Sequence, residues 1–195
     1  MQVNNYWAET LKGALPVGES FDMLARDIQI GDKKAVMFYV DGLVTGQSMP
    51  LVMSYLFRVD TSHAGSITDT KEFIETNLPY LNAQAESKMD KVLKFIFSGL
   101  IALAVEGFSE AIIIDARFYP DRGVEEPSKE KSLRGAKDGF TESFMTNIAL
   151  IRRRIRDPNL IFKSHTVGKT TQTDISLAYV KGKADDALVQ KISDK

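Results

Sequence analysis

The chain has 195 residues, of which 44% are hydrophobic, enough to bury a core in one large domain or in two small ones. The charges of its 25 basic and 26 acidic side chains nearly cancel, so the chain lacks the strong positive net charge typical of nucleic-acid-binding proteins. A charged partner would therefore have to bind to a local patch of charge. There is no cysteine, so disulfides, thiolate nucleophiles and thiolate metal sites are excluded, and exposure to the cytoplasm is the default expectation.

The first half of the sequence predicts one β-hairpin and two helices. Two runs rich in apolar residues flank a Gly-Asp-Lys-Lys sequence, a composition typical of a tight turn between paired strands. Apolar residues at helical spacing indicate the helices. The predicted hairpin strands are residues 21–30 and 35–40, and the predicted helices are residues 48–57 and 70–77. Tyr6 and Trp7 are interpreted as packing residues, and no secretory signal is recognised at the N-terminus.

The second half predicts two further strand pairs and three helices. Its longest apolar run, residues 95–105, is shorter than the roughly 20 residues that a membrane-spanning helix needs. A polar stretch at residues 82–87 is interpreted as a domain boundary. The predicted elements are a helix at 88–97, strands at 99–105 and 111–115, a charged loop at 117–138, a helix at 139–156, paired strands at 160–167 and 173–180, and a helix at 184–192.

This order of elements favours an α+β (mixed α/β) fold over an alternating, doubly wound sheet. We expect two small subdomains, each a short mixed or antiparallel sheet packed with helices. The first subdomain is expected to span residues 1–84, and the second is expected to span residues 85–195.

The helix predicted at residues 139–156 carries an apolar stripe that is expected to face the core. The stripe consists of Phe140, Phe144, Ile148, Ile151 and Ile155. Asn147 lies inside the stripe, so its amide needs a hydrogen-bond partner, which the preceding loop is expected to supply. Arg154 lies at the margin of the stripe, and Asp138 is the candidate N-cap. We expect Arg152, Arg153 and Arg156 to point toward solvent or a partner.

Residues 117–156 are locally basic. They hold ten basic and six acidic side chains, a net charge of +4 in a chain whose total is −1. One interpretation is a surface that binds a partner, and the other is a loop held by ordinary ion pairs beside a solvated helix face. Glu125 and Glu126 are predicted to anchor the loop through Arg122, Arg134 or Arg154 rather than to act as a catalytic acid and base, because no nucleophile motif accompanies them.

Three sequence stretches in this region resemble the signature of the GerA/SpoVAF family of spore-germination membrane proteins, in order and in spacing. They are YPDRGVEEP at residues 119–127, RGAKDGFTE at residues 134–142 and NIALIRRRIRDP at residues 147–158. The resemblance extends more weakly to GESFD at residues 18–22 and to Val167-Gly168. The residues of the second and third stretches resemble the SpoVAF branch more than the A subunits of nutrient receptors.

The resemblance implies an integral protein of the spore inner membrane, with an N-terminal region on the cytoplasmic, spore-core side made of two small α/β subdomains. It implies partners among the other subunits of a germination complex, a homo-oligomer in the full-length form, and a role in assembly and signalling of a receptor or ion-release channel. Because no membrane span is recognised, we expect the chain to be the truncated N-terminal part of such a protein. The alternative is the A subunit of a nutrient germinant receptor that binds a small ligand in the cleft between its subdomains.

Other site-like features are assigned no function. Gly168-Lys169-Thr170 resembles the end of a phosphate-binding loop but lies between two predicted strands, and Lys163 occupies the position that requires glycine. His63 and His165 have no partners at metal-ligand spacing. We therefore predict no enzyme, no cofactor, no metal site and no nucleic-acid partner.

Overall fold

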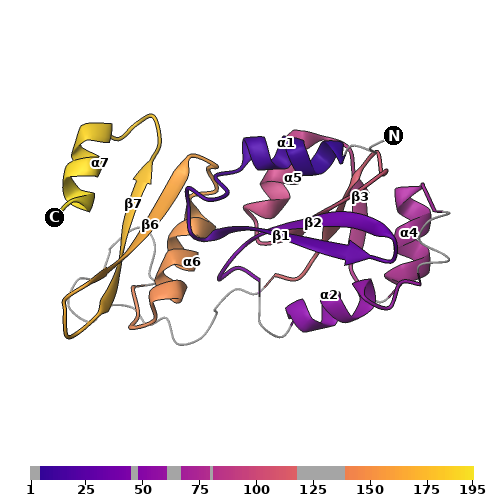
Figure 1. Ribbon diagram of the computed structural model, residues 1–195, viewed down its shortest axis with the longest axis horizontal. Helices are drawn as coiled ribbons and strands as arrows, with labels where there is room; N and C mark the ends of the chain where they lie inside the picture. The colour runs from indigo at the N-terminus through magenta and orange to yellow at the C-terminus, as the bar shows by residue number, and fades with distance from the viewer. Residues whose placement is uncertain (1–4, 45–47, 61–66, 80, 118–138) are drawn as a thin grey trace.

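The computed structural model describes residues 5–44, 48–60, 67–79, 81–117 and 139–195 (Figure 1). Predictions that fall on other positions lie outside the described residues. They concern Arg122, Glu125, Glu126, Arg134, Asp138 and His63.

A five-stranded antiparallel sheet forms the larger part of the molecule, with strand order β1-β2-β4-β5-β3. Gly31 makes the tight β1–β2 turn with φ of 58°, a left-handed conformation that glycine adopts without a Cβ clash. The strands are β1 (Met23–Ile30), β2 (Lys33–Val40), β3 (Ala83–Glu86), β4 (Ile101–Val105) and β5 (Ala111–Ile114).

Helices cover both faces of this sheet, so its central strands are apolar on both sides. Along β4, Ile101 and Leu103 point into one core cluster and Ala102 and Ala104 into the other, as the two-residue period of a strand requires. One face packs against α1 (Tyr6–Ala14) and α5 (Met89–Ile96), and the other packs against α2 (Ser48–Leu56) and α4 (Thr70–Asn77) (Figure 1).

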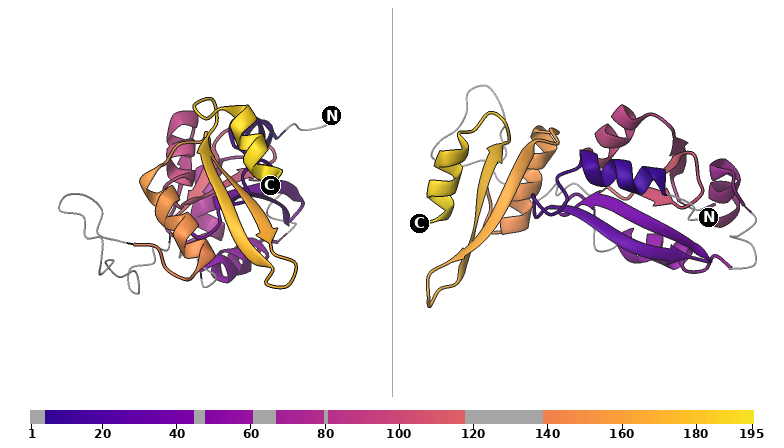
Figure 2. Two further views of the ribbon diagram at one scale, coloured as in Figure 1. Left: turned by 90° about the vertical axis from the view of Figure 1, so that its left-hand side faces the viewer. Right: turned by 45° about the horizontal axis from the view of Figure 1, so that its top comes forward.

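A smaller unit follows at one end of the molecule (Figure 2). Its two-stranded antiparallel sheet consists of β6 (Leu160–Val167) and β7 (Thr173–Val180), and α7 (Asp186–Ser193) follows it. The helix α6 (Phe144–Arg154) lies between this hairpin and the five-stranded sheet (Figure 1). Within the described ranges, every helix is too short or too polar to cross a bilayer.

The predicted fold class is confirmed: the chain is α+β, with helices packed on two antiparallel sheets. All three predicted strand pairs are present, and the helix at 70–77 has the predicted bounds because Asp69 caps its first amides. Two elements were not predicted, the helix α1 and the strand β3.

The strand topology contradicts the predicted boundary between residues 84 and 85. β3 runs across that boundary, and β4, which follows it, pairs with β2, which precedes it. The polar stretch at 82–87 becomes an edge strand because its backbone pairs with β5. A division that follows the sheets lies between β5, which ends at Ile114, and β6, which begins at Leu160.

Candidate functional site

The most unusual side chain of the described part is Arg152, which is fully buried at the joint between the two sheets. Its Nε donates to Asp22 Oδ2 at 2.8 Å and its Nη2 donates to Asp22 Oδ1 at 3.0 Å, a bidentate ion pair with a carboxylate that is itself fully buried. Ser20 completes the set, because its hydroxyl donates to Asp22 and accepts from the backbone N–H of Phe162 at 2.9 Å. We call Ser20, Asp22 and Arg152 the Arg152 network.

The network ties together three segments, of which the one around Asp22 is 130 residues from Arg152 and the other two are neighbours in sequence. Arg152 belongs to α6, Asp22 lies just before β1, and the remaining guanidinium donors reach the backbone oxygens of Asp157 at 3.1 Å and Leu160 at 2.9 Å, before and at the start of β6. The guanidinium also lies 5.4 Å from the ring centroid of Phe97 and 4.9 Å from that of Phe162. The arginine therefore holds the smaller sheet against the larger one.

A second ion pair crosses the same joint at the surface. Lys181 Nζ lies 2.7 Å from Glu19 Oε2, and both side chains are more than half exposed. Glu19 holds the pKa of Lys181 above its ordinary value through this hydrogen bond and its charge. Because water screens such a pair, its contribution to stability is small compared with that of a buried network.

The helix α6 also contacts the first sheet directly. A Cβ atom on Gly42, which has φ of 81°, would lie 3.3 Å from Ala149 Cβ, so the turn after β2 approaches the helix closely because the glycine has no side chain. Arg156 Nη1 donates to Ser98 Oγ at 3.2 Å, beyond the end of α5. Arg156 therefore makes a hydrogen bond within the chain while remaining exposed at the surface.

Asn147 organises the start of α6. Its Oδ1 accepts from the backbone N–H of Thr141 at 2.7 Å, and its Nδ2 donates to the backbone oxygen of Thr141 at 2.7 Å. Ser143 caps the helix by accepting from the N–H of Thr146. The predicted need for a partner is thus confirmed, and the partner is a backbone rather than a charged loop residue.

Exposed apolar side chains flank α6 on both sides in the sequence, and together with the exposed arginines of the helix they form a surface that we call the outer side of α6. Phe140 is 72% exposed, and Ile155 is exposed at the other end of the helix. Between them lies a small hollow of about 260 Å³, lined by these two residues together with Leu150, Ile151 and Arg154. Arg153 and Arg154 are exposed on this helix as well.

The structure corrects two parts of the sequence interpretation. Arg152 was expected to face solvent or a partner and is instead fully buried. The helix begins at Phe144 and ends at Arg154, so Phe140 and Ile155 lie outside it and are not part of the stripe. Phe144, Ile148 and Ile151 do pack in the core cluster beneath α6, as predicted.

Sequence reasoning did not identify Ser20 and Asp22 as partners of Arg152. Their only signal was the weak extension of the family resemblance through residues 18–22. The two residues lie 132 and 130 positions from Arg152, so no local pattern joins them.

A shallow groove of about 450 Å³ runs between the start of β1 and β6. It is lined by both units, and three of its polar side chains contact other residues: Ser20 binds Asp22, Glu19 binds Lys181, and Lys163 lies 5.8 Å from the ring centroid of Tyr179. Ser164 and His165 also line it. Among the described residues, no three His, Asp or Glu side chains converge to hold a metal ion.

Comparison with known sequences gives relatives over almost the whole chain. Stage V sporulation protein AF of Bacillus subtilis (strain 168) is 38% identical over 184 residues, covering 93% of this chain and 37% of that protein. Spore germination protein KA of the same organism is 33% identical over 197 residues, covering 96% of this chain and 34% of that protein. The chain therefore spans little more than a third of the length of these relatives.

A solved structure has the same fold. The crystal structure of the N-terminal domain of the A subunit of the Bacillus megaterium spore germinant receptor GerK3 matches with a TM-score of 0.68 and 26% identity, covering 96% of this chain and 68% of that chain. The family model described as Bacillus/Clostridium GerA spore germination protein matches residues 9–195. Since that match covers nearly the whole sequence, the chain belongs to the GerA family of spore germination proteins.

Proposed function

We propose that this chain is the N-terminal region of a longer spore-germination membrane protein and that the outer side of α6 binds another subunit of a germination complex. In this proposal the region lies on the cytoplasmic side of the spore inner membrane and acts in assembly and signalling rather than in catalysis. The similarity to spore germination proteins and to a receptor A-subunit domain supports the proposal that the protein acts in spore germination.

The observation that carries the proposal is the composition of the outer side of α6. Aromatic and arginine side chains are enriched where protein surfaces bind one another, and a large exposed phenylalanine beside an apolar hollow is costly to leave in water. Phe140, Ile155 and Arg154 have this character, whereas Arg152 is buried in the Arg152 network and Arg156 donates to Ser98 within the chain. The proposed contact surface therefore consists of Phe140, Ile151, Arg153, Arg154 and Ile155.

A Phe140→Ser variant of the full-length protein is expected to lose most of its co-purification with other germination subunits and to slow germination, while the isolated chain keeps its unfolding midpoint. Arg153→Glu is expected to act in the same direction, because it reverses a charge on this surface. The measurements are affinity purification from spore membranes and the rate of germination.

The matched control is Phe57→Ser, since Phe57 is 63% exposed but lies just after α2, outside the proposed contact surface. This variant is expected to behave like the unmodified protein. Normal subunit recovery and germination in both Phe140→Ser and Arg153→Glu would refute the proposed contact surface.

The alternative, a receptor module that binds a small ligand between its two units, would use the groove between β1 and β6. Because Ser20 and Glu19 in that groove are engaged by other side chains, we expect no thermal stabilisation of the chain by amino acids, nucleosides, dipicolinate or monovalent cations. An increase of several degrees in the unfolding temperature with one of these compounds, abolished by Ser164→Trp in the groove, would favour the alternative instead.

A further inference from the structure

The turn after β2 contains an Asp-Gly pair in which a side chain lies against the following backbone nitrogen. Asp41 is exposed, and its Oδ1 accepts a hydrogen bond from the backbone N–H of Gly42 at 3.0 Å. Because Oδ1 is bonded directly to Cγ, this contact holds the nitrogen of Gly42 beside the carboxyl carbon of Asp41. Gly42 has no side chain that would shield either atom.

Four other aspartates of the described residues approach a different nitrogen. Their carboxylates accept from the backbone N–H two residues further on, which is the arrangement of helix caps and Asx turns. The pairs are Asp69 with Lys71, Asp115 with Arg117, Asp157 with Asn159 and Asp185 with Ala187. Asp41 differs from these four because its carboxylate contacts the nitrogen of the peptide bond that it precedes.

We infer that Asp41 is a site of spontaneous modification, at which the folded chain forms isoaspartate, and that this change loosens the contact between the turn and α6. In the first step the nitrogen of Gly42 attacks Cγ of Asp41 in its carboxylic acid form. The new N–Cγ bond closes a five-membered succinimide ring, and the carboxyl OH leaves with the N–H proton as water. Holding the two reacting groups in contact makes such an intramolecular step faster.

Water from the solvent then opens the succinimide ring, and it reaches the turn because Asp41 is exposed. Addition of water at Cγ restores aspartate. Addition at the main-chain carbonyl carbon of Asp41 instead leaves the chain connected through Cβ and Cγ, so the backbone of the turn becomes one carbon longer. The mass of the chain is unchanged, since one water molecule leaves and one is added.

The turn packs too tightly to absorb a longer backbone without a shift. A Cβ atom on Gly42 would lie 3.3 Å from Ala149 Cβ and 3.4 Å from the backbone oxygen of Met145, and both of these residues belong to α6. The backbone N–H of Asp41 also donates to the backbone oxygen of Asp22 at 2.7 Å. Isoaspartate therefore displaces the turn relative to α6, next to the buried carboxylate of Asp22.

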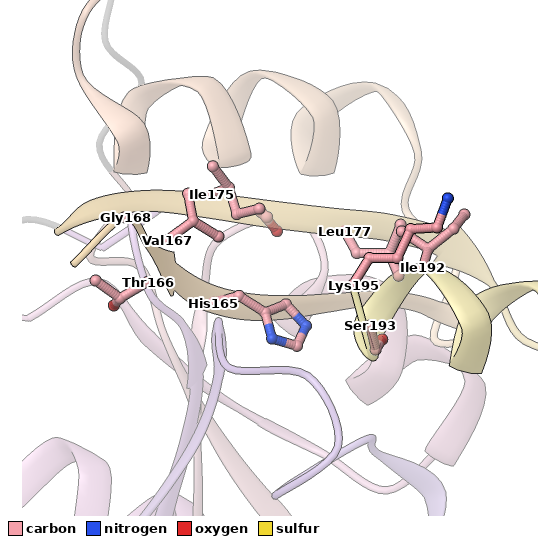
Figure 3. A pocket seen from close by; sticks show the side chains of 10 residues that line it. His165, Thr166, Val167, Gly168, Ile175, Leu177, Ile192, Ser193 and Lys195 are labelled. Atoms are coloured by element: carbon pink, nitrogen blue, oxygen red, sulfur yellow. The ribbon is translucent and has the colours of Figure 1, made fainter. Parts of the chain in front are cut away.

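The hairpin holds α6 from its other side. Ile148 and Ile151 belong to the same core cluster as Phe162 of β6, and the hairpin lies between α6 and α7 (Figures 1 and 3). The cavity of about 460 Å³ drawn in Figure 3 has a lining that includes His165 and Leu177, whose side chains point to the face of the hairpin opposite to Phe162. That cavity gives α6 no room to follow the turn, so we expect their contact to loosen.

The first measurement follows isoaspartate in the chain kept folded for several weeks at physiological temperature and neutral pH. Trypsin releases residues 35–58 as one peptide, in which Asp41 is the only acidic residue. Chromatography separates its two forms, and methylation by protein L-isoaspartate methyltransferase identifies the modified one. The second Asp-Gly pair of the sequence, at 138–139, lies in a different tryptic peptide. We expect isoaspartate to form in the folded chain at least as fast as in a synthetic peptide of residues 38–47.

The second measurement is hydrogen exchange of the α6 amides. We expect the isoaspartate fraction of the incubated chain, isolated by ion-exchange chromatography, to exchange these amides about tenfold faster than the fresh chain, because the helix opens more readily. The matched control is Asp41→Glu, which keeps the charge but closes only a six-membered ring, a far slower reaction. Incubated Asp41→Glu is expected to exchange like its fresh form.

Three results would overturn the inference. The first is an amount of isoaspartate at Asp41 no greater than in the fresh chain. The second is a rate in the folded chain far below that in the peptide, which would mean that the fold protects this bond. The third is isoaspartate without faster exchange in α6, which would mean that the turn absorbs the longer backbone. All of these measurements use the 195-residue chain alone, so their outcome is independent of the proposed contact surface, whose test requires other germination subunits.

Discussion

An Arg152→Met variant is expected to lose about 3–5 kcal/mol of unfolding free energy, because removing one partner of a buried ion pair leaves the other charge buried without compensation. Methionine replaces part of the arginine stem, but the Asp22 carboxylate then keeps only the Ser20 hydroxyl from the network. The backbone oxygens of Asp157 and Leu160 also lose their donors. Urea unfolding followed by far-ultraviolet circular dichroism measures the loss.

Two control variants each remove a positive charge that is exposed rather than buried. Arg153→Met removes the next arginine of the same helix, which is exposed, and Lys181→Met breaks the exposed pair with Glu19 across the same joint. Each is expected to destabilise the chain far less than Arg152→Met, because water screens exposed charges. A loss for Arg152→Met no larger than those of the controls would contradict the assignment of the Arg152 network as the connection between the two sheets.

The double variant Asp22→Leu with Arg152→Met tests the pairing itself. Since both charges are then absent, it is expected to lose less stability than the sum of the two single variants. Additive losses would show that the two side chains stabilise the protein independently, despite the 2.8 Å contact between Nε and Oδ2.

Most elements of the fold could be predicted from local sequence because local interactions determine them. The β6–β7 hairpin was predicted with its observed bounds, since two alternating strands flank a turn that contains Gly168. The strand β3 could not be predicted, because Ala-Gln-Ala-Glu has little strand preference and pairing with β5 alone makes it extended.

The candidate site was predicted only in part, for a physical reason. The sequence indicates α6 and the need of Asn147 for a partner, because both depend on neighbours within a few residues. An arginine can be buried only where a carboxylate or other acceptor pairs with it, and that acceptor can be far away in the sequence. For Arg152 the acceptor is Asp22, which lies 130 residues before it. A run of arginines therefore shows a basic segment without showing which member turns inward.

The helix α1 is a different case, because local signals for it exist. Asn5 accepts a hydrogen bond from the N–H of Ala8 as N-cap, and Trp7, Leu11 and Leu15 recur at helical spacing and are buried. These residues belong to the core cluster on one face of the five-stranded sheet. The helix is thus an integral layer of the larger unit, and the interpretation of Trp7 as a packing residue is confirmed.

A Trp7→Ala variant is consequently expected to lose about 3–5 kcal/mol of unfolding free energy, the usual cost of removing a large aromatic side chain from a core. Trp7 is 3% exposed, and its Nε1 donates to the backbone oxygen of Ser109 at 2.9 Å, so the variant loses packing and leaves that oxygen without this donor. Because Trp7 is the only tryptophan, circular dichroism rather than intrinsic fluorescence must follow the unfolding of the variant.

The neighbouring Tyr6 provides the matched control, since it contacts the edge of the Trp7 ring but is 66% exposed. Tyr6→Ala is expected to cost less than about 1 kcal/mol, as most surface substitutions do. Equal stability of the two variants would mean that α1 is not part of the core. A large loss of unfolding free energy confined to Trp7→Ala would instead mean that removing α1 exposes one face of the sheet to water. Experiments on the outer side of α6 must then use a protein that retains α1.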